Sequence, residues 1–139
     1  MTQELKALTF RRLHEGPGAF VIPNPWDAGS ARLLESLGFR ALATTSAGLA
    51  FSLAKPDGTN AVSRDEALRN ARAIVDATSL PVAADLENGY GADPRDCART
   101  ITEAAATIAV LPSQTSRRGS TCAPLASQSR ISSSAGTTK

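Results

Sequence analysis

Two carboxylates lie two residues apart in the segment Asp85–Gly91, which follows a short apolar run. If that segment is extended, the Asp85 and Glu87 side chains point to the same side of the chain. Ligand sets made only of oxygen suit Mg²⁺, or Mn²⁺ as a second choice, because these ions combine one or two carboxylates with water. Gly89 and Gly91 allow close approach of another backbone. The spacing predicts a metal site, and the alternative is a polar strand end that leads into a glycine turn.

A second candidate segment contains Ser46, Ala47 and Gly48, which follow another apolar run. Small residues leave backbone N–H groups accessible, and such groups can hold a carboxylate or a phosphonate. The alternative for this segment is an ordinary tight turn. Asp57, in the segment Lys55–Gly58, offers a further carboxylate near these residues, although most aspartates in such loops only form Asx turns.

The other residues whose side chains could react or bind a metal are more consistent with structural roles. His14 is the one histidine, which argues against a histidine-rich metal site or a Ser-His-Asp triad, and we expect it at the surface. Cys97 and Cys122 are too few for a disulfide framework or a four-cysteine zinc site. We expect Cys97 to be a small buried apolar residue and assign no role to Cys122, and we expect Trp26 to pack against its neighbours.

Composition excludes several classes of protein. A chain of 139 residues suffices for one domain. Its net charge of +2 is too small to indicate nucleic-acid or membrane-surface binding, and no apolar run is long enough to span a membrane. No signal peptide is visible at the N-terminus. We therefore expect a cytoplasmic protein that binds a small molecule, with no nucleic acid and no membrane as partner.

Strands and helices alternate along most of the chain. Apolar spacing and capping residues predict helices over residues 2–14, 28–37, 64–77 and 94–106. Short apolar runs predict strands over residues 19–22, 40–45, 81–85 and 108–111, with a long connection over 46–59. This alternation is typical of a parallel α/β sheet, whose ligand sites lie at the carboxyl ends of the strands.

Two architectures fit this alternation, an open doubly wound sheet and a (β/α)₈ barrel. Neither G-x-G-x-x-G nor G-x-x-x-x-G-K-[ST] is present, which argues against a nucleotide-binding open sheet. A complete barrel needs about 200–250 residues, so the roughly four β/α units here correspond to its N-terminal half. A small open-sheet binding module is the other architecture that this length allows.

The composition changes abruptly near residue 104. All 13 acidic residues lie at or before Glu103, whereas 12 of the 27 residues from Ser113 to Lys139 are Ser or Thr. We therefore divide the chain into a folded part, 1–111, and a disordered tail, 112–139, which has too few apolar residues to form a core. The tail is a solvated extension, a sparse basic arm for nucleic acid, or an out-of-frame sequence. The abrupt change favours the out-of-frame origin.

Three ordered motifs together resemble the isocitrate lyase/phosphoenolpyruvate mutase superfamily. They are Pro23–Ala31, Ala43–Ala50 and Pro81–Gly91, within a resemblance that covers roughly residues 5–107. The small bacterial members that these motifs resemble are those called carboxyvinyl-carboxyphosphonate phosphorylmutase or methylisocitrate lyase-like. The resemblance implies a (β/α)₈ barrel, a Mg²⁺ ion and a family that forms homo-oligomers.

The resemblance also implies roles for the residues identified above. Asp85 and Glu87 match the metal-shell carboxylates, Ser46 to Gly48 match the loop that holds the substrate carboxylate, and Asp57 matches an active-site loop aspartate. The implied activity is that of a Mg²⁺-dependent lyase or phosphonomutase. Its substrate would be a small keto acid, a 2-hydroxy dicarboxylate or a phosphonate, converted through a pyruvate-enolate-like intermediate.

The sequence departs from the superfamily pattern at several positions. Glu87 stands where many members have Asp, and Thr44 stands where several have an aromatic residue. The gating loop, a later acidic residue and a substrate-binding arginine should follow the fourth strand, where this chain has its Ser/Thr-rich segment. The family-like sequence therefore stops at about residue 107, as truncation or a frameshift would produce. The alternative to an enzyme is an inactive truncated fragment without independent catalysis. Such a fragment would also lack the C-terminal helices through which relatives associate.

Overall fold

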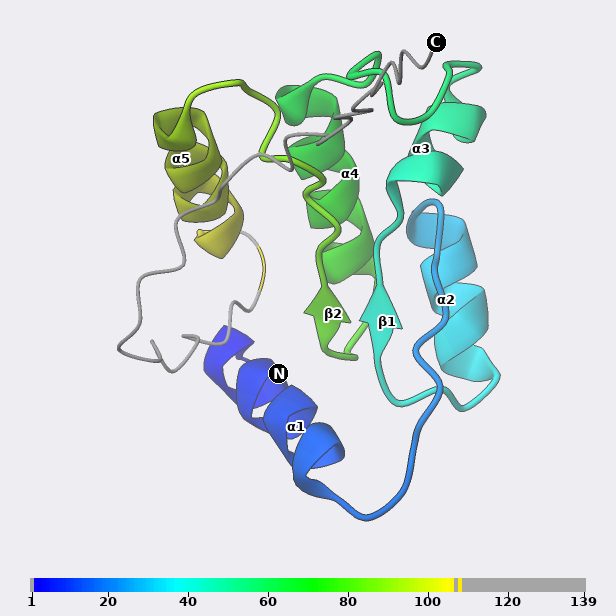
Figure 1. Cartoon of the computed structure of the whole chain (residues 1–139). Coiled ribbons are helices and arrows are strands. Elements are labelled where there is room, and N and C mark those ends of the chain that lie inside the picture. Colours follow the sequence, from blue (N-terminus) through cyan, green and yellow to red (C-terminus); the bar gives the residue numbers. More distant parts are fainter. Residues whose placement is uncertain (1, 107, 109–139) are drawn as a thin grey trace, which may run out of the picture.

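The computed structural model describes residues 2–106 and 108 as five helices and two strands (Figure 1). In chain order they are α1 (Gln3–Glu15), α2 (Ala28–Ser36), β1 (Leu42–Ala43), α3 (Ser46–Ser52), α4 (Arg64–Ala77), β2 (Val82–Ala83) and α5 (Pro94–Ala105). The strand expected over 108–111, apart from Ile108, and the tail expected over 112–139 lie outside the described residues.

The two strands form a parallel pair, as the alternation of elements predicted. Leu42 lies opposite Val82 and Ala43 opposite Ala83, and α3 and α4 form the crossover between the strands. Parallel strands require such a crossover because the chain must return to the edge from which the first strand started. The α/β class is confirmed, and the described residues form a fragment of such a fold with two strands.

Capping residues set the start of the main helices where the sequence indicated. The Ser63 hydroxyl accepts from the Glu66 amide, and the Glu66 side chain accepts in return from the Ser63 amide. Asp27 caps α2 in the same reciprocal way with Ser30. These capping boxes satisfy N–H groups that have no partner within the helix, which explains why α2 and α4 start at these positions.

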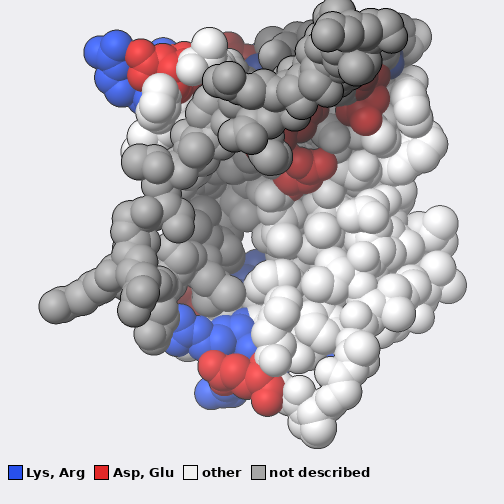
Figure 2. Space-filling view, viewed as in Figure 1, with Lys and Arg blue, Asp and Glu red and all other residues white. Residues whose placement is uncertain are grey.

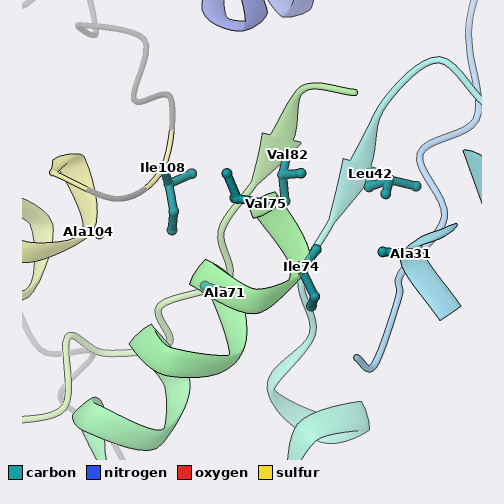
Figure 3. Packing of buried hydrophobic residues seen from close by; sticks show 8 residues of the cluster. All are labelled: Ala31, Leu42, Ala71, Ile74, Val75, Val82, Ala104 and Ile108. Carbon is teal, nitrogen blue, oxygen red and sulfur yellow. The ribbon is translucent and has the colours of Figure 1, made fainter. Parts of the chain in front are cut away.

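The hydrophobic core lies between α4 and the strand pair, and extends to α2 and α5 (Figure 3). Ala71, Ile74 and Val75 share one face of α4, since side chains three and four residues apart lie on the same side of a helix. Leu42 and Ile74 are fully buried. The core consists of Ala31, Leu42, Ala71, Ile74, Val75, Val82, Ala104 and Ile108.

Three expected elements differ from the structure. Residues 19–22 form no strand: Val21 is 68% exposed, and the main-chain hydrogen bond to β1 comes one residue later, from the Ala43 amide to the Pro23 carbonyl. Proline has no N–H to continue such a ladder. The strand predicted over 40–45 shortens to two residues, and the connection predicted over 46–59 contains α3.

α1 lies apart from the other helices, at the end of the structure from which both strands start (Figure 1). It is joined to α4 by Lys6, whose Nζ donates to the carbonyl oxygens of Val75 at 3.3 Å and Thr78 at 2.7 Å. The Lys6 side chain is buried, and this burial lowers its pKa below the usual value. No helix in the described part of the chain is long and apolar enough to cross a membrane.

Candidate active site at the carboxyl ends of the strands

Hydrogen bonds join the two loops that follow the strands. The amide of Asp85 donates to the Thr44 hydroxyl at 2.9 Å, and the amide of Ser46 donates to Asp85 Oδ2 at 3.0 Å. Asp85 follows β2 and Ser46 follows β1, so these bonds cross between loops almost 40 residues apart in the chain. The parallel pairing thus brings together the two segments in which the sequence placed candidate functional residues.

The geometry of the carboxylate pair differs from the expected one. Glu87 has φ +45°, a left-handed conformation, and its amide donates to Asp85 Oδ1 at 3.1 Å. The segment is therefore a turn closed by an aspartate side chain, and the expectation of an extended strand end is wrong. The reason is local, because an aspartate readily accepts from the amide two residues ahead and so stabilises a turn.

The charges of Asp57 and Asp85 nevertheless both act on Glu87, and we call these three carboxylates the acidic cluster. Burial, followed by the charges of Asp57 and Asp85, raises the pKa of Glu87 above its usual value. Burial, followed by the charges of Glu87, Asp85 and Asp57, raises the pKa of Tyr90 to about 12. Among the described residues, no lysine or arginine forms an ion pair with the acidic cluster. Figure 2 shows acidic side chains gathered at the end of the molecule towards which both strands run.

The donor set of the acidic cluster suits Mg²⁺ bound through few protein ligands. Within the part of the chain that the structure describes, no three His, Cys, Asp or Glu side chains are arranged to hold a metal by themselves. Mg²⁺ needs only one or two carboxylates, because it keeps several of its waters. Each oxygen of Asp85 accepts one backbone amide, and a carboxylate oxygen has a further lone pair to offer.

Ser46, Ala47 and Gly48 form the first turn of α3, so the alternative of an ordinary tight turn is wrong. Thr45 caps this helix, and its hydroxyl accepts from the Gly48 amide at 3.3 Å. The Ser46 amide is bonded to Asp85. Two of the three expected anion-binding amides are therefore already used, which leaves the Ala47 amide and the Ser46 hydroxyl without a hydrogen bond to another described residue.

Helix α5 supports the loop after β2, which contains Asp85 and Glu87 of the acidic cluster. The Thr100 hydroxyl, fully buried, donates to the Gly89 carbonyl at 2.7 Å. A Cβ at Gly89 would lie 2.7 Å from Cys97 Cα, so glycine is required for this approach. Cys97 is half-buried rather than fully buried. Sequence reasoning missed Thr100. The one signal available for it was its position on the amphipathic helix α5, four residues after Asp96.

Trp26 lies against a neighbouring segment and His14 lies at the surface, as the sequence predicted. Trp26 is 49% exposed and its indole lies against Gly48, where an added Cβ would come within 2.4 Å of the ring. His14 is exposed, its Nδ1 lies 2.8 Å from the Phe10 carbonyl oxygen, and its ring contacts Phe10 and Phe20 edge-on. Neither residue contributes to the acidic cluster.

Comparison with known proteins places this geometry in one family. Residues 10–111 match the family model of phosphoenolpyruvate phosphomutase. An uncharacterized protein of Mycobacterium tuberculosis is 36% identical over 91 residues, which cover 63% of this chain and 33% of that protein. The 2-methylisocitrate lyase of Bacillus subtilis is 31% identical over 90 residues, covering 65% of this chain and 30% of the enzyme.

Solved structures agree with these relatives. A Burkholderia cenocepacia J2315 protein, provisionally assigned as a lyase/mutase, is 56% identical with a TM-score of 0.72, covering 76% of this chain and 37% of that one. The phosphoenolpyruvate phosphomutase of Streptomyces platensis subsp. rosaceus is 28% identical with a TM-score of 0.69, covering 74% and 36%. The chain spans about a third of the length of the curated relatives it matches. It belongs to the phosphoenolpyruvate phosphomutase family, within the PEP mutase/isocitrate lyase superfamily.

Proposed function

We propose that this chain carries the metal-binding and part of the substrate-binding residues of a Mg²⁺-dependent lyase or phosphonomutase. The substrate would be a small keto acid, a 2-hydroxy dicarboxylate or a phosphonate. The observation that supports the proposal is the acidic cluster, in which burial and the charges of Asp57 and Asp85 raise the pKa of Glu87 and no described lysine or arginine forms an ion pair with the three carboxylates. A divalent cation would relieve that repulsion.

Each residue has a distinct role in this proposal. Asp85 and Glu87 would hold Mg²⁺, or Mn²⁺ in its place. When bound, the cation supplies Lewis-acid stabilisation of negative charge on a substrate oxygen. The Ser46 hydroxyl and the Ala47 amide would donate to a substrate carboxylate, while Gly48 lets the Trp26 ring pack beside them.

Asp57 would act from the other loop. As an ionised carboxylate it can only accept, so it would bind a substrate hydroxyl or take its proton. Its charge contributes to the raised pKa of Glu87, which indicates that the two carboxylates lie near each other. A bound cation between the loops would lower that mutual repulsion.

The decisive experiment is a calorimetric titration of Mg²⁺ into the purified chain and its Asp85→Asn variant. We expect the variant to lose at least about tenfold in affinity, since each tenfold corresponds to ~1.4 kcal/mol and a direct charged ligand is worth more than that. Asp76→Asn, an exposed carboxylate on α4 that is ion-paired with Arg72, is the matched control and should leave the affinity unchanged. Equal Mg²⁺ affinity in the native chain and Asp85→Asn would contradict the proposal.

Turnover separates an active enzyme from a fragment that only binds. The assay uses 2-methylisocitrate, 2,3-dimethylmalate and oxaloacetate, compounds that occur in the names of the related enzymes. Mg²⁺-dependent release of a keto acid or of oxalate that Asp57→Asn abolishes would support catalysis by this chain. Mg²⁺ binding without turnover would instead support the alternative of a binding-competent fragment.

A further inference from the structure

Thr44 ends the backbone pairing of the two strands. It is the first residue after β1, and only 7% of its surface is exposed. Its amide continues the parallel ladder by donating to the Ala83 carbonyl at 2.9 Å. In such a ladder the next bond runs from the Asp85 amide to the carbonyl of residue 44. The Asp85 amide donates to the Thr44 hydroxyl instead, so a side chain takes the place of a backbone acceptor.

Asp85 is bonded in return to the loop that follows β1. Its Oδ2 accepts from the Ser46 amide at 3.0 Å, so each of the two segments binds the backbone of the other through a side chain. We call these two bonds, from Asp85 to Thr44 and to Ser46, the clamp. Since Asp85 Oδ1 also accepts from the Glu87 amide, the backbone and the carboxylate of Asp85 are fixed together.

A carboxylate held in this way suits Mg²⁺ better than a larger cation. Mg²⁺ demands near-ideal octahedral geometry, whereas Ca²⁺ accepts more oxygen ligands in flexible arrangements. Asp85 is exposed and can meet a cation from solvent, while the Thr44 hydroxyl that holds it is buried. Groups that orient a metal ligand without touching the metal typically change metal affinity by about 10–100-fold.

We propose that Thr44 is a positioning residue that holds Asp85 in the orientation in which it binds Mg²⁺, and that the clamp makes the site prefer Mg²⁺ to Ca²⁺. This inference rests on the proposed function, in which Asp85 is a metal ligand. Without the Thr44 hydroxyl, the Asp85 amide can return to the carbonyl of residue 44, where the ladder would place it. The chain would remain folded, but the Asp85 carboxylate would no longer be fixed.

The test titrates Mg²⁺ or Ca²⁺ calorimetrically into the full chain and into Thr44→Val, which keeps the shape of the side chain and removes the acceptor. We expect Mg²⁺ affinity to fall by about tenfold or more. Ca²⁺ affinity should fall clearly less, because a loosely held carboxylate still serves the more adaptable ion. Thr44→Ser keeps the hydroxyl and should retain both affinities. If circular dichroism shows Thr44→Val to be unfolded, Thr44→Cys, whose thiol accepts only weakly, provides the same comparison.

Thr78→Val is the matched control. Thr78 is 6% exposed, and its hydroxyl accepts from the Leu80 amide at 3.1 Å, so the same kind of buried bond is lost before β2 instead of after it. This variant should keep the native Mg²⁺ affinity. An equal loss of Mg²⁺ affinity in Thr78→Val would show that general loosening of the fold is the cause, and would overturn the inference.

Three further results would also overturn it: native Mg²⁺ affinity in Thr44→Val, equal losses for Mg²⁺ and Ca²⁺, or a loss in Thr44→Ser as large as in Thr44→Val. The proposed function would stand in each case if Asp85→Asn still loses Mg²⁺ affinity. Mg²⁺ affinity that neither Asp85→Asn nor Thr44→Val changes would contradict the proposed function as well.

Discussion

Individual residues in the loops around the acidic cluster adopt backbone conformations that L-amino acids rarely take. Among the described residues, the non-glycine positions with positive φ are Ala54 and Asn60, between α3 and α4, and Glu87 and Tyr90, in the loop after β2. Such conformations cost free energy and persist where surrounding contacts enforce them, which is typical of functional sites. The acidic cluster therefore depends on loops held in place by other residues.

Gly89 is the position where both backbone conformation and space require glycine. We expect Gly89→Ala to destabilise the chain by about 2 kcal/mol or more, because φ is +83° and the new Cβ would lie 2.7 Å from Cys97 Cα. Gly18→Ala is the control, since Gly18 has φ +81° and nothing within 4 Å. Urea unfolding should show a clearly larger loss for Gly89→Ala, and equal losses would contradict the packing argument.

Glu66 makes stability depend on pH. The Lys55 ammonium, followed by the Ser63 amide and hydroxyl, lowers the pKa of Glu66 from 4.5 to about 2. A lowered pKa in the folded state means that the ionised form stabilises the fold above pH 4.5 and loses this effect as the pH falls towards 2. We expect Glu66→Gln to melt at a lower temperature than the native chain at pH 7.

The same difference in melting temperature should shrink steadily below pH 4.5 and vanish near pH 2. Thermal unfolding followed by circular dichroism at several pH values measures it. Asp65→Asn removes an exposed carboxylate from the same helical turn and serves as the reference against which the Glu66→Gln curve is compared. If the difference in melting temperature between Glu66→Gln and the native chain stays constant with pH, the stabilisation by Glu66 does not come from its charge.

At the scale of elements, α5 holds the loop that contains Asp85 and Glu87 of the acidic cluster. Its buried Thr100 bonds to the Gly89 carbonyl, and its first residues approach Gly89 and Gly91 closely. β2 itself has only two residues, too few to fix the loop that follows it. The loop therefore takes its geometry from packing against a helix that comes later in the chain.

Thr100→Val tests this dependence because it keeps the shape of the side chain and removes one donor. We expect a loss of about 1–3 kcal/mol in stability, the cost of leaving a buried acceptor unsatisfied, together with weaker Mg²⁺ binding. Thr102→Val, which removes an exposed hydroxyl bonded to the Ala98 carbonyl within α5, should change neither quantity appreciably. Unaltered Mg²⁺ affinity in Thr100→Val would show that α5 does not position the loop.

At the scale of the whole molecule, α1 is attached differently from the rest. The core of the described residues joins α2, α4, α5 and the strands, whereas α1 contributes no residue to it. Its principal connection is the buried Lys6, bonded to the last carbonyl groups of α4. A helix of 13 residues is barely stable alone in water, so its persistence depends on this connection.

Lys6→Met should release α1 while the core stays folded. We expect amide hydrogen exchange in residues 3–15 to accelerate by about tenfold or more, since each tenfold corresponds to ~1.4 kcal/mol and two buried hydrogen bonds are lost. Exchange in α4 should change much less. Arg12→Met, an exposed position in the last turn of α1, provides the control. Uniformly faster exchange throughout the chain would instead show that α1 stabilises the whole fold.

The sequence by itself determined helices α1, α2, α4 and α5, the α/β class and the family, whereas it missed α3. Helix capping by Asp27 and Ser63 depends on residues only three positions apart, and so does the apolar spacing in α4. Such local features can be read directly from the sequence. The same holds for the motifs around Ser46 and Asp85, which identified the family from short segments. The sequence also predicted candidate site residues in the loops at the carboxyl ends of the strands, and hydrogen bonds join the loops after β1 and β2.

Only the tertiary structure decided how those residues are arranged. It formed a turn over Asp85–Glu87 instead of an extended segment, used the Ser46 amide to bind Asp85, and brought the charge of Asp57 near Glu87. It also placed Thr100 beneath the loop and the Thr44 hydroxyl against the Asp85 amide. These features depend on contacts between segments that are far apart in the sequence. Which hydrogen-bond partner a group takes is decided only when the folded chain brings those segments together.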